Sequence, residues 1–327
     1  MKRRTFAASM IAATAAASTV SIVASGAMAQ TRRDELVKLR VQILRFSSDA
    51  ALYLGVQHGF FKQEGIELEI TPVPNPAASI AALQSGHCDV AYGAIVPSLT
   101  AIGNGIPLRF LAPADGFPLR AEDSSERYDG TSLFAAKDSG ITHPKELEGE
   151  VVVVTSRKSQ SEITIANAIK ADGGDVSKVK WVVLDQPSAL QALNAGRVAA
   201  SALYSPFSAM ARENGHKQIA SPGFAFFERG VVGVWITSQG ALESKKDALL
   251  AFKRAMIKSN AYAAKNFDEA YDKAAEFTKI PKKTLTSGPL PVWLTDLQQE
   301  SVDRAAKKMF DLGYLSKIPK TGDLIVN

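Results

Sequence analysis

Two distant stretches of the sequence are built on the same plan. Asn75–Ser98 and Gln186–Ser208 each contain a proline, an alanine-rich segment, a glycine, a short apolar run and a second proline, with ALQSG in the first and ALNAG in the second. Proline is common in the first turn of a helix and glycine just after the last, so each stretch predicts a helix, a stop, a strand and a new helix. Units this far apart favour two lobes of similar construction over a short-period solenoid. Chance is the alternative, because Ala-Leu-x-x-Gly is common at helix ends.

The surrounding sequence alternates between strand-like and helix-like segments. Val37–Phe46 has the alternation of a strand, Asp49–Gly59 is helical, and Val151–Thr155 is a β-branched run typical of a strand buried on both faces. This order predicts an α/β fold in which helices flank mostly parallel sheets. Pro113–Gly130 breaks the pattern as a polar loop, and Gly230–Thr237 resembles a strand that returns. The chain is therefore expected to cross between two lobes twice.

These breaks define the expected domains. A chain of 327 residues suits about two domains with separate cores. We expect one lobe to contain residues 37–112 and 236–327, the other to contain residues 132–230, and residues 113–131 and 231–235 to form the crossing segments of a hinge. The helical residues after Glu243 are expected to pack on the first lobe.

The first 29 residues have the features of a secretory signal. They begin with basic residues, continue with an alanine-rich stretch and end in Ala27-Met28-Ala29, which predicts cleavage before Gln30. The Arg3-Arg4 pair fits a twin-arginine signal, and an ordinary Sec signal remains the alternative. The only cysteine, Cys88, is too far from the new terminus to carry a lipid. The sequence thus predicts a soluble periplasmic protein without a lipid anchor or a disulfide.

Several function classes are disfavoured by what the sequence lacks. The formal charge is +5 and the basic residues form no long run, so a nucleic-acid partner is not expected. The four histidines are scattered without the spacing of metal ligands. No phosphate-binding glycine loop and no G-x-S-x-G motif occur. We therefore predict no metal, no cofactor and no catalytic residue.

Polar residues instead gather where predicted strands end and helices begin. Ligands of open α/β sheets bind outside the carboxyl ends of the strands, and helix N-termini there offer free N–H groups to an anion. Arg157 follows a buried strand and could add a charge-assisted contact. Phe117, Tyr204 and Phe207 are expected to form an apolar wall. Arg229 and Arg120 lie near the crossings and either reach the ligand or stay on the surface. The remaining candidates for ligand binding are Ser47, Ser48, Asp49, Asn75, Ser79, Ser98, Ser159, Gln160 and Ser161.

Four segments resemble the periplasmic substrate-binding proteins of ABC importers, in the branch that handles nitrate, taurine, alkanesulfonates and thiamine precursors. They are LYLGVQHGFFKQEGIELEI, ALQSGHCDVAYG, LFAAKDSGITHPKELEGEVVVVTSRKSQSE and ALNAGRVAASALYSPF, and the resemblance covers about residues 40–265. Asp89 stands at the usual place of an aspartate. Ala199 stands where the family commonly has a second aspartate. Arg157, Lys158 and Gln160 stand where small residues are frequent in the family.

The resemblance implies a two-lobed periplasmic-binding-protein fold of type II, with two crossing strands as its hinge. It implies a monomer that captures a small solute between its lobes and delivers it to the transmembrane subunits of an ABC permease. The helix starts predict a small organic anion, a carboxylate or sulfonate with or without an aromatic ring. The alternative is an enzyme or a sensor module on the same scaffold that acts on or senses a pyrimidine-like ring.

Overall fold

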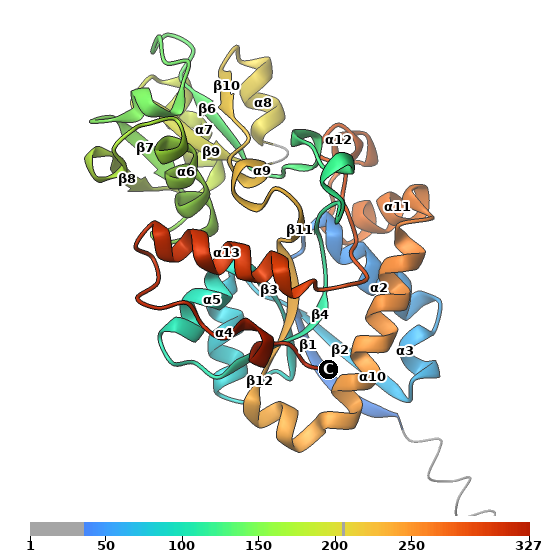
Figure 1. The fold of residues 1–327 in the computed structure, drawn as a ribbon. Coiled ribbons are helices and arrows are strands. Elements are labelled where there is room, and N and C mark those ends of the chain that lie inside the picture. The colour runs from blue at the N-terminus through green and yellow to red at the C-terminus, as the bar shows by residue number, and fades with distance from the viewer. Residues whose placement is uncertain (1–35, 205–206) are drawn as a thin grey trace, which may run out of the picture.

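The computed structural model describes residues 36–204 and 207–327 and has two lobes, each built around its own five-stranded sheet (Figure 1). The predicted α/β fold with two lobes is confirmed. The predicted signal peptide, residues 1–29, lies outside the described residues. Within the described ranges, no helix has the length and apolar character needed to cross a membrane.

The sheet of lobe one has the strand order β2-β1-β3-β12-β4. Its strands are β1 (Val37–Ile43), β2 (Ile66–Pro72), β3 (Val90–Ala94), β4 (Leu108–Pro113) and β12 (Gly233–Ser238). β1 pairs in parallel with β2 and β3, whereas β12 is antiparallel to both β3 and β4. The returning strand therefore inserts between two strands that point the other way.

The sheet of lobe two has the order β10-β6-β9-β7-β8. Its strands are β6 (Ser132–Ala135), β7 (Val151–Val154), β8 (Lys180–Val183), β9 (Ala200–Leu203) and β10 (Lys217–Ala220). β7 lies in parallel between β8 and β9, whereas β6 is antiparallel to β9 and β10. Val152, Val153 and Val154 are buried, as a β-branched run between two helical layers should be.

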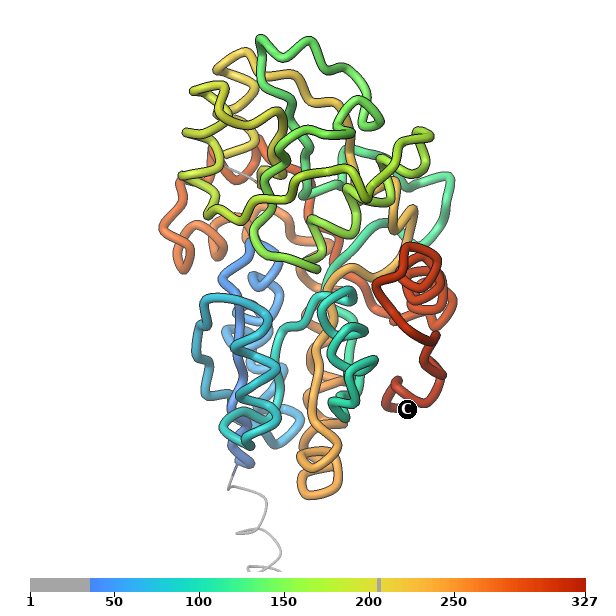
Figure 2. Tube along the Cα trace, turned by 90° about the vertical axis from the view of Figure 1, so that its left-hand side faces the viewer, coloured from blue at the N-terminus to red at the C-terminus, as the bar shows by residue number. Residues whose placement is uncertain are grey.

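Helices cover both sheets. Lobe one carries α2 (Ala50–Gln57), α3 (Phe60–Gln63), α4 (Pro76–Gln84), α5 (Ile95–Gly103), α10 (Gln239–Ala263), α11 (Phe267–Thr278) and α12 (Lys282–Thr286). Lobe two carries α6 (Gln160–Ala171), α7 (Gln186–Asn194), α8 (Phe207–Glu213) and α9 (Pro222–Phe227). α13 (Gln299–Asp311) contacts both α5 and α9, and it lies at the level where the lobes meet (Figures 1 and 2).

The repeated sequence unit forms the same structure in each lobe. α4, β3 and α5 form the first copy, and α7, β9 and α8 form the second. Gly86 and Gly196 follow the helices with positive φ angles of 71° and 63°. In each copy the glycine N–H donates to the leucine carbonyl, and the next N–H donates to the alanine carbonyl, from His87 to Ala82 and from Arg197 to Ala192. This is the Schellman helix ending, so the shared pentapeptide encodes the same helix stop twice.

Two short strands connect the lobes. β5 (Gly116–Phe117) pairs in antiparallel fashion with β11 (Gly230–Val231). The two backbones approach so closely that a Cβ atom on Gly116 would lie 2.1 Å from the Gly230 carbonyl oxygen. Only glycine fits there. The pair of crossing strands expected for this fold is therefore present.

Candidate functional site

The topology brings the carboxyl ends of both sheets to the crossing strands. β4 enters the crossing at its carboxyl end, and β1, β2 and β3 point the same way as β4. β6 leaves the crossing at its amino end and is antiparallel to β9, which is parallel to β7. The carboxyl ends of β7, β8 and β9 therefore also point to the crossing. Strand ends of this kind are where open α/β sheets bind ligands.

The face of lobe one is formed by the turn after β1. Arg45 has a left-handed φ of 57°, and the turn continues through the short 3-10 helix η1 (Ser47–Asp49). The Trp293 indole N–H donates to the Ser48 carbonyl over 2.7 Å. Phe46 is left 50% exposed, and its ring lies edge-on to Tyr92 at a centroid distance of 5.6 Å. The turn thus holds an exposed aromatic ring beside a group of polar side chains.

Two carboxyl groups lie behind this turn. The Asp49 side chain is buried and accepts a hydrogen bond from the Phe46 N–H at 3.0 Å. Asp115 is half-buried, and the Tyr92 hydroxyl lies 3.1 Å from each of its carboxyl oxygens. Burial and the nearby charge of Asp115 raise the pKa of Asp49 to about 8. Burial also raises the pKa of Asp115, although hydrogen bonds from Ser48 and Tyr92 oppose the shift.

The face of lobe two is a row of hydroxyl groups. The Ser159 and Ser161 hydroxyls lie 2.9 Å apart, and the Thr155 hydroxyl lies 3.4 Å from that of Ser161. Ser159 also caps α6 by accepting a hydrogen bond from the Glu162 N–H. Burial raises the pKa of Tyr204, which hydrogen-bonds with Ser161 and Thr131. The predicted residues Ser159, Ser161 and Tyr204 are therefore together, next to the start of a twelve-residue helix.

Arg157 already has a carboxylate partner. Its Nε and Nη2 atoms donate to Glu162 over 2.7 and 3.3 Å, and this glutamate is 1% exposed. The Lys158 N–H and the Tyr314 hydroxyl also donate to the Glu162 carboxylate. The Arg157 side chain is still 56% exposed. An anionic ligand would have to share this guanidinium with a buried glutamate.

Other predicted residues are buried, cap a helix, pack on a core or form ion pairs. Ser79 and Ser98 are fully buried, and Phe117 is 2% exposed and packs against Phe224 and Phe227. The Asn75 side chain caps α4, and Phe207 packs on the core of lobe two. The side-chain amide oxygen of Gln160, Oε1, is buried without a hydrogen-bond partner within the described residues. Arg229 pairs with Glu300, and Arg120 pairs with Asp123 and Glu122. Their expected roles in ligand binding stay predictions.

Five residues of the candidate site are not predicted from the sequence: Phe46, Tyr92, Asp115, Trp293 and Tyr314. Phe46 was placed inside a strand, and Tyr92 lies in an apolar run that looks like core. Asp115 and Trp293 come together through a β-bridge between segments far apart in the sequence. The one available signal was the position of Asp115, directly after the β4 strand.

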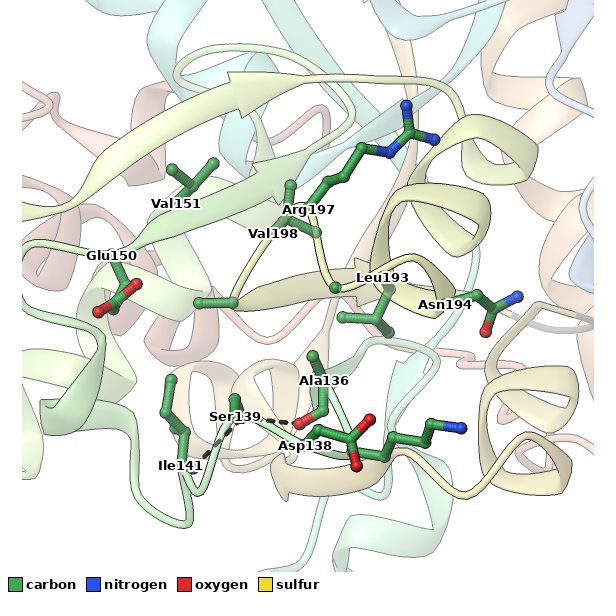
Figure 3. A pocket seen from close by; sticks show the side chains of 13 residues that line it. Ala136, Asp138, Ser139, Ile141, Glu150, Val151, Leu193, Asn194, Arg197 and Val198 are labelled. Carbon is green, nitrogen blue, oxygen red and sulfur yellow. Dashed lines mark hydrogen bonds between the residues drawn. The ribbon is translucent and has the colours of Figure 1, made fainter.

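A separate pocket lies at the opposite end of the lobe-two sheet (Figure 3). It is lined by the loop after β6, the start of β7 and the connection between α7 and β9. Lys137, Asp138, Glu150 and Arg197 give it mixed charge. Among the residues that the structure describes, no cluster of three or more His, Cys, Asp or Glu side chains could hold a metal ion.

Comparison with known proteins gives a family and a fold. The family model described as NMT1/THI5 like matches residues 47–270. No curated protein sequence matches the chain. Solved structures that share its fold include the three described next. The alkanesulfonate-binding protein SsuA from Xanthomonas axonopodis pv. citri, bound to MOPS, has a TM-score of 0.69 at 16% identity, with 89% of this chain and 99% of that chain covered.

The aliphatic sulphonate binding protein SsuA from Escherichia coli has a TM-score of 0.68 at 16% identity, covering 89% of this chain and 92% of that one. The nitrate-binding protein NrtA from Synechocystis PCC 6803 has a TM-score of 0.69 at 12% identity, and the match covers 89% of this chain and 86% of that chain. The predicted resemblance to the nitrate and sulfonate branch is confirmed. Since the family model matches more than half of its residues, the chain belongs to the NMT1/THI5-like family.

Proposed function

We propose that this protein captures a small organic solute between its two lobes and delivers it to an ABC permease, without transforming it. The observation that carries the proposal is the convergence of both sets of strand carboxyl ends on the crossing strands. In this proposal the protein acts as a periplasmic monomer after removal of residues 1–29. Its lobes are residues 37–112 with 236–327 and residues 132–230, and the crossings act as the hinge.

The solute in this proposal carries a carboxylate or sulfonate group. The Ser159 and Ser161 hydroxyls and the start of α6 would donate hydrogen bonds to it. Arg157 would supply positive charge while it remains bonded to Glu162. Neutral donors at a helix N-terminus can hold an anion without a dedicated counter-ion, so this site does not require Arg157 to leave its partner.

A thermal-shift panel of carboxylates, sulfonates and neutral analogues tests the proposal on the chain that begins at Gln30. An organic anion should raise the melting temperature by mass action and be recovered chemically unchanged. Isothermal titration should then show at least tenfold weaker binding by Arg157→Gln, about 1.4 kcal/mol. Arg120→Gln is the matched control, because Arg120 is exposed and pairs only with neighbouring residues. Stabilisation by neutral compounds alone, or conversion of the solute, would refute the proposal.

A further inference from the structure

The lobe-one face carries acidic groups that lack basic partners. Asp49 and Asp115 lie close enough for the charge of one to act on the other. Within residues 36–204 and 207–327, neither forms an ion pair. By contrast, Asp89 in the same lobe is paired with both Arg40 and Lys245. Asp89 thus has two cationic partners, whereas the two aspartates near the strand ends have none among the described residues.

Asp49 also has an unused hydrogen-bonding atom. Its Oδ2 accepts from the Phe46 N–H, but its Oδ1 is buried and has no partner among the described residues. Only 1% of the residue is exposed. A buried carboxyl oxygen without a partner is costly, because it has lost its water and gained nothing in return. Asp49 therefore keeps an unused acceptor atom close to Asp115.

Asp115 is the less buried of the two aspartates. It is half-buried, and its carboxyl oxygens accept from neutral donors, which are the Tyr92 and Ser48 hydroxyls and the Gly233 N–H. A carboxylate has about four acceptor positions, so three donors leave one unused. The half-exposed Phe46 ring stands beside Tyr92 and gives the same place an aromatic wall. A cation can lie against such a ring with favourable energy.

We propose that Asp115, supported by Asp49, binds a protonated amine of the solute. An ammonium group has three N–H donors and no acceptor, which matches a site made of carboxyl oxygens, and the aromatic ring of Phe46 would cover it. This inference rests on the proposed capture of a solute between the lobes and extends it. The solute then carries its amine on lobe one and its acidic group at the hydroxyl row of lobe two. It is a zwitterion.

Two pairs of probes isolate the amine. Taurine and isethionate share a sulfonate and differ in an amine against a hydroxyl, and 4-(aminomethyl)benzoate and 4-(hydroxymethyl)benzoate form a longer aromatic pair. In at least one pair, the amine should bind at least tenfold more tightly by isothermal titration calorimetry. Asp115→Asn should reduce this preference below threefold, because the amide no longer offers a negative charge to the ammonium group. Asp123→Asn, which alters an exposed carboxylate paired with Arg120, should keep the full preference.

The outcomes separate the two proposals. Equal binding within both pairs overturns the amine site and leaves capture of an anion standing. Binding of benzylamine without binding of either hydroxyl probe supports the amine site and overturns the anion. Absence of binding by all five compounds overturns both. If Asp115→Asn loses structure, as circular dichroism would show, Asp49→Asn replaces it and must weaken the preference for the amine. A preference that survives in the folded variant contradicts the inference.

Discussion

At the scale of single residues, the least ordinary group is the buried carboxyl of Asp49. Burial and the charge of Asp115 raise its pKa from 3.8 to about 8 in the folded protein. The folded state therefore binds the proton more tightly than the unfolded chain. The stabilisation from Asp49 is fully present below pH 3.8 and is lost progressively as the pH rises towards 8.

Asp49→Asn should make stability less sensitive to pH. The asparagine keeps the shape and can still accept from the Phe46 N–H, but it does not ionise. Between pH 5 and pH 8 the free energy of unfolding of the wild type should fall relative to this variant by about 1 kcal/mol or more, since one pKa unit corresponds to about 1.4 kcal/mol. Urea unfolding at both pH values measures the difference, with the exposed-site variant Asp123→Asn as control. Parallel pH profiles for wild type and Asp49→Asn would contradict the assignment.

Asp49 could be predicted from the sequence, whereas the nearby Asp115 could not. A polar residue between a strand and a helix is recognisable from local pattern, which is why Ser48, Asp49, Ser159 and Ser161 could be named. The electrostatic influence of Asp115 on Asp49 depends on how the chain passes β12 after β4, where the Asp115 backbone pairs with Gly233. The pairing of Arg157 with Glu162 is not predicted either, because a glutamate in the first turn of a helix is typical of a capping box and does not indicate an arginine partner.

At the scale of elements, most strands and long helices could be predicted because their apolar patterns are strong. One predicted boundary is wrong because a strand loses its pairing partner. β1 ends at Ile43 because its parallel partner β2 ends opposite it at Pro72, so Phe46 leaves the sheet. Proline after His143 is typical of the first turn of a helix, but the structure has only a single 3-10 turn there, Pro144–Leu147, in which the Glu146 side chain accepts from the His143 N–H. A capping pattern marks the start of a helix but carries no information on its length.

The short helix α9 supplies a prediction at this scale. Asp129 accepts hydrogen bonds from the Thr131 and Phe224 N–H groups at 2.8 Å, which fixes the start of α9. A Cβ atom on Gly223 would lie 2.3 Å from the Asp129 Oδ1. Gly223→Ala should therefore cost about 1–3 kcal/mol in the free energy of unfolding, because the buried carboxylate must leave its position.

Gly240→Ala is the matched control for that substitution. Gly240 lies in the first turn of α10, and a Cβ atom there has no neighbour within 4 Å. The change should stabilise the protein by up to about 1 kcal/mol, because alanine loses less backbone entropy in a helix than glycine. Urea unfolding of both variants tests the pair. Equal effects at the two positions would show that contact with Asp129 does not limit residue 223.

At the scale of the whole molecule, a few side chains tie the lobes together beside the crossing strands. The Tyr314 hydroxyl donates to Glu162 at the start of α6, over 3.1 Å. The Lys170 ammonium donates to the Asp311 carbonyl at the end of α13. Because α13 also packs on α5, these contacts join the C-terminal segment on lobe one to a helix of lobe two. Nothing local in the sequence marks such pairs, since they depend on how the two lobes are placed.

The Tyr314 hydroxyl should therefore favour the arrangement in which the lobes are close. Removing it with Tyr314→Phe takes away an interlobe hydrogen bond and keeps the ring. In the absence of solute, the variant should have a larger radius of gyration by small-angle X-ray scattering. It should also bind solute a few-fold more weakly, because apparent affinity scales with the population of the binding-competent state.

The matched control is Tyr262→Phe, whose hydroxyl donates to Glu269 over 2.8 Å within lobe one. Both substitutions remove a bond between a tyrosine and a carboxylate, so their costs in stability should be similar. Only Tyr314→Phe should change the radius of gyration, because only its partner lies on the other lobe. If both variants scatter like the wild type, the Tyr314 contact does not set the distance between the lobes, and the crossing strands β5 and β11 hold that distance together with the remaining contacts of α13.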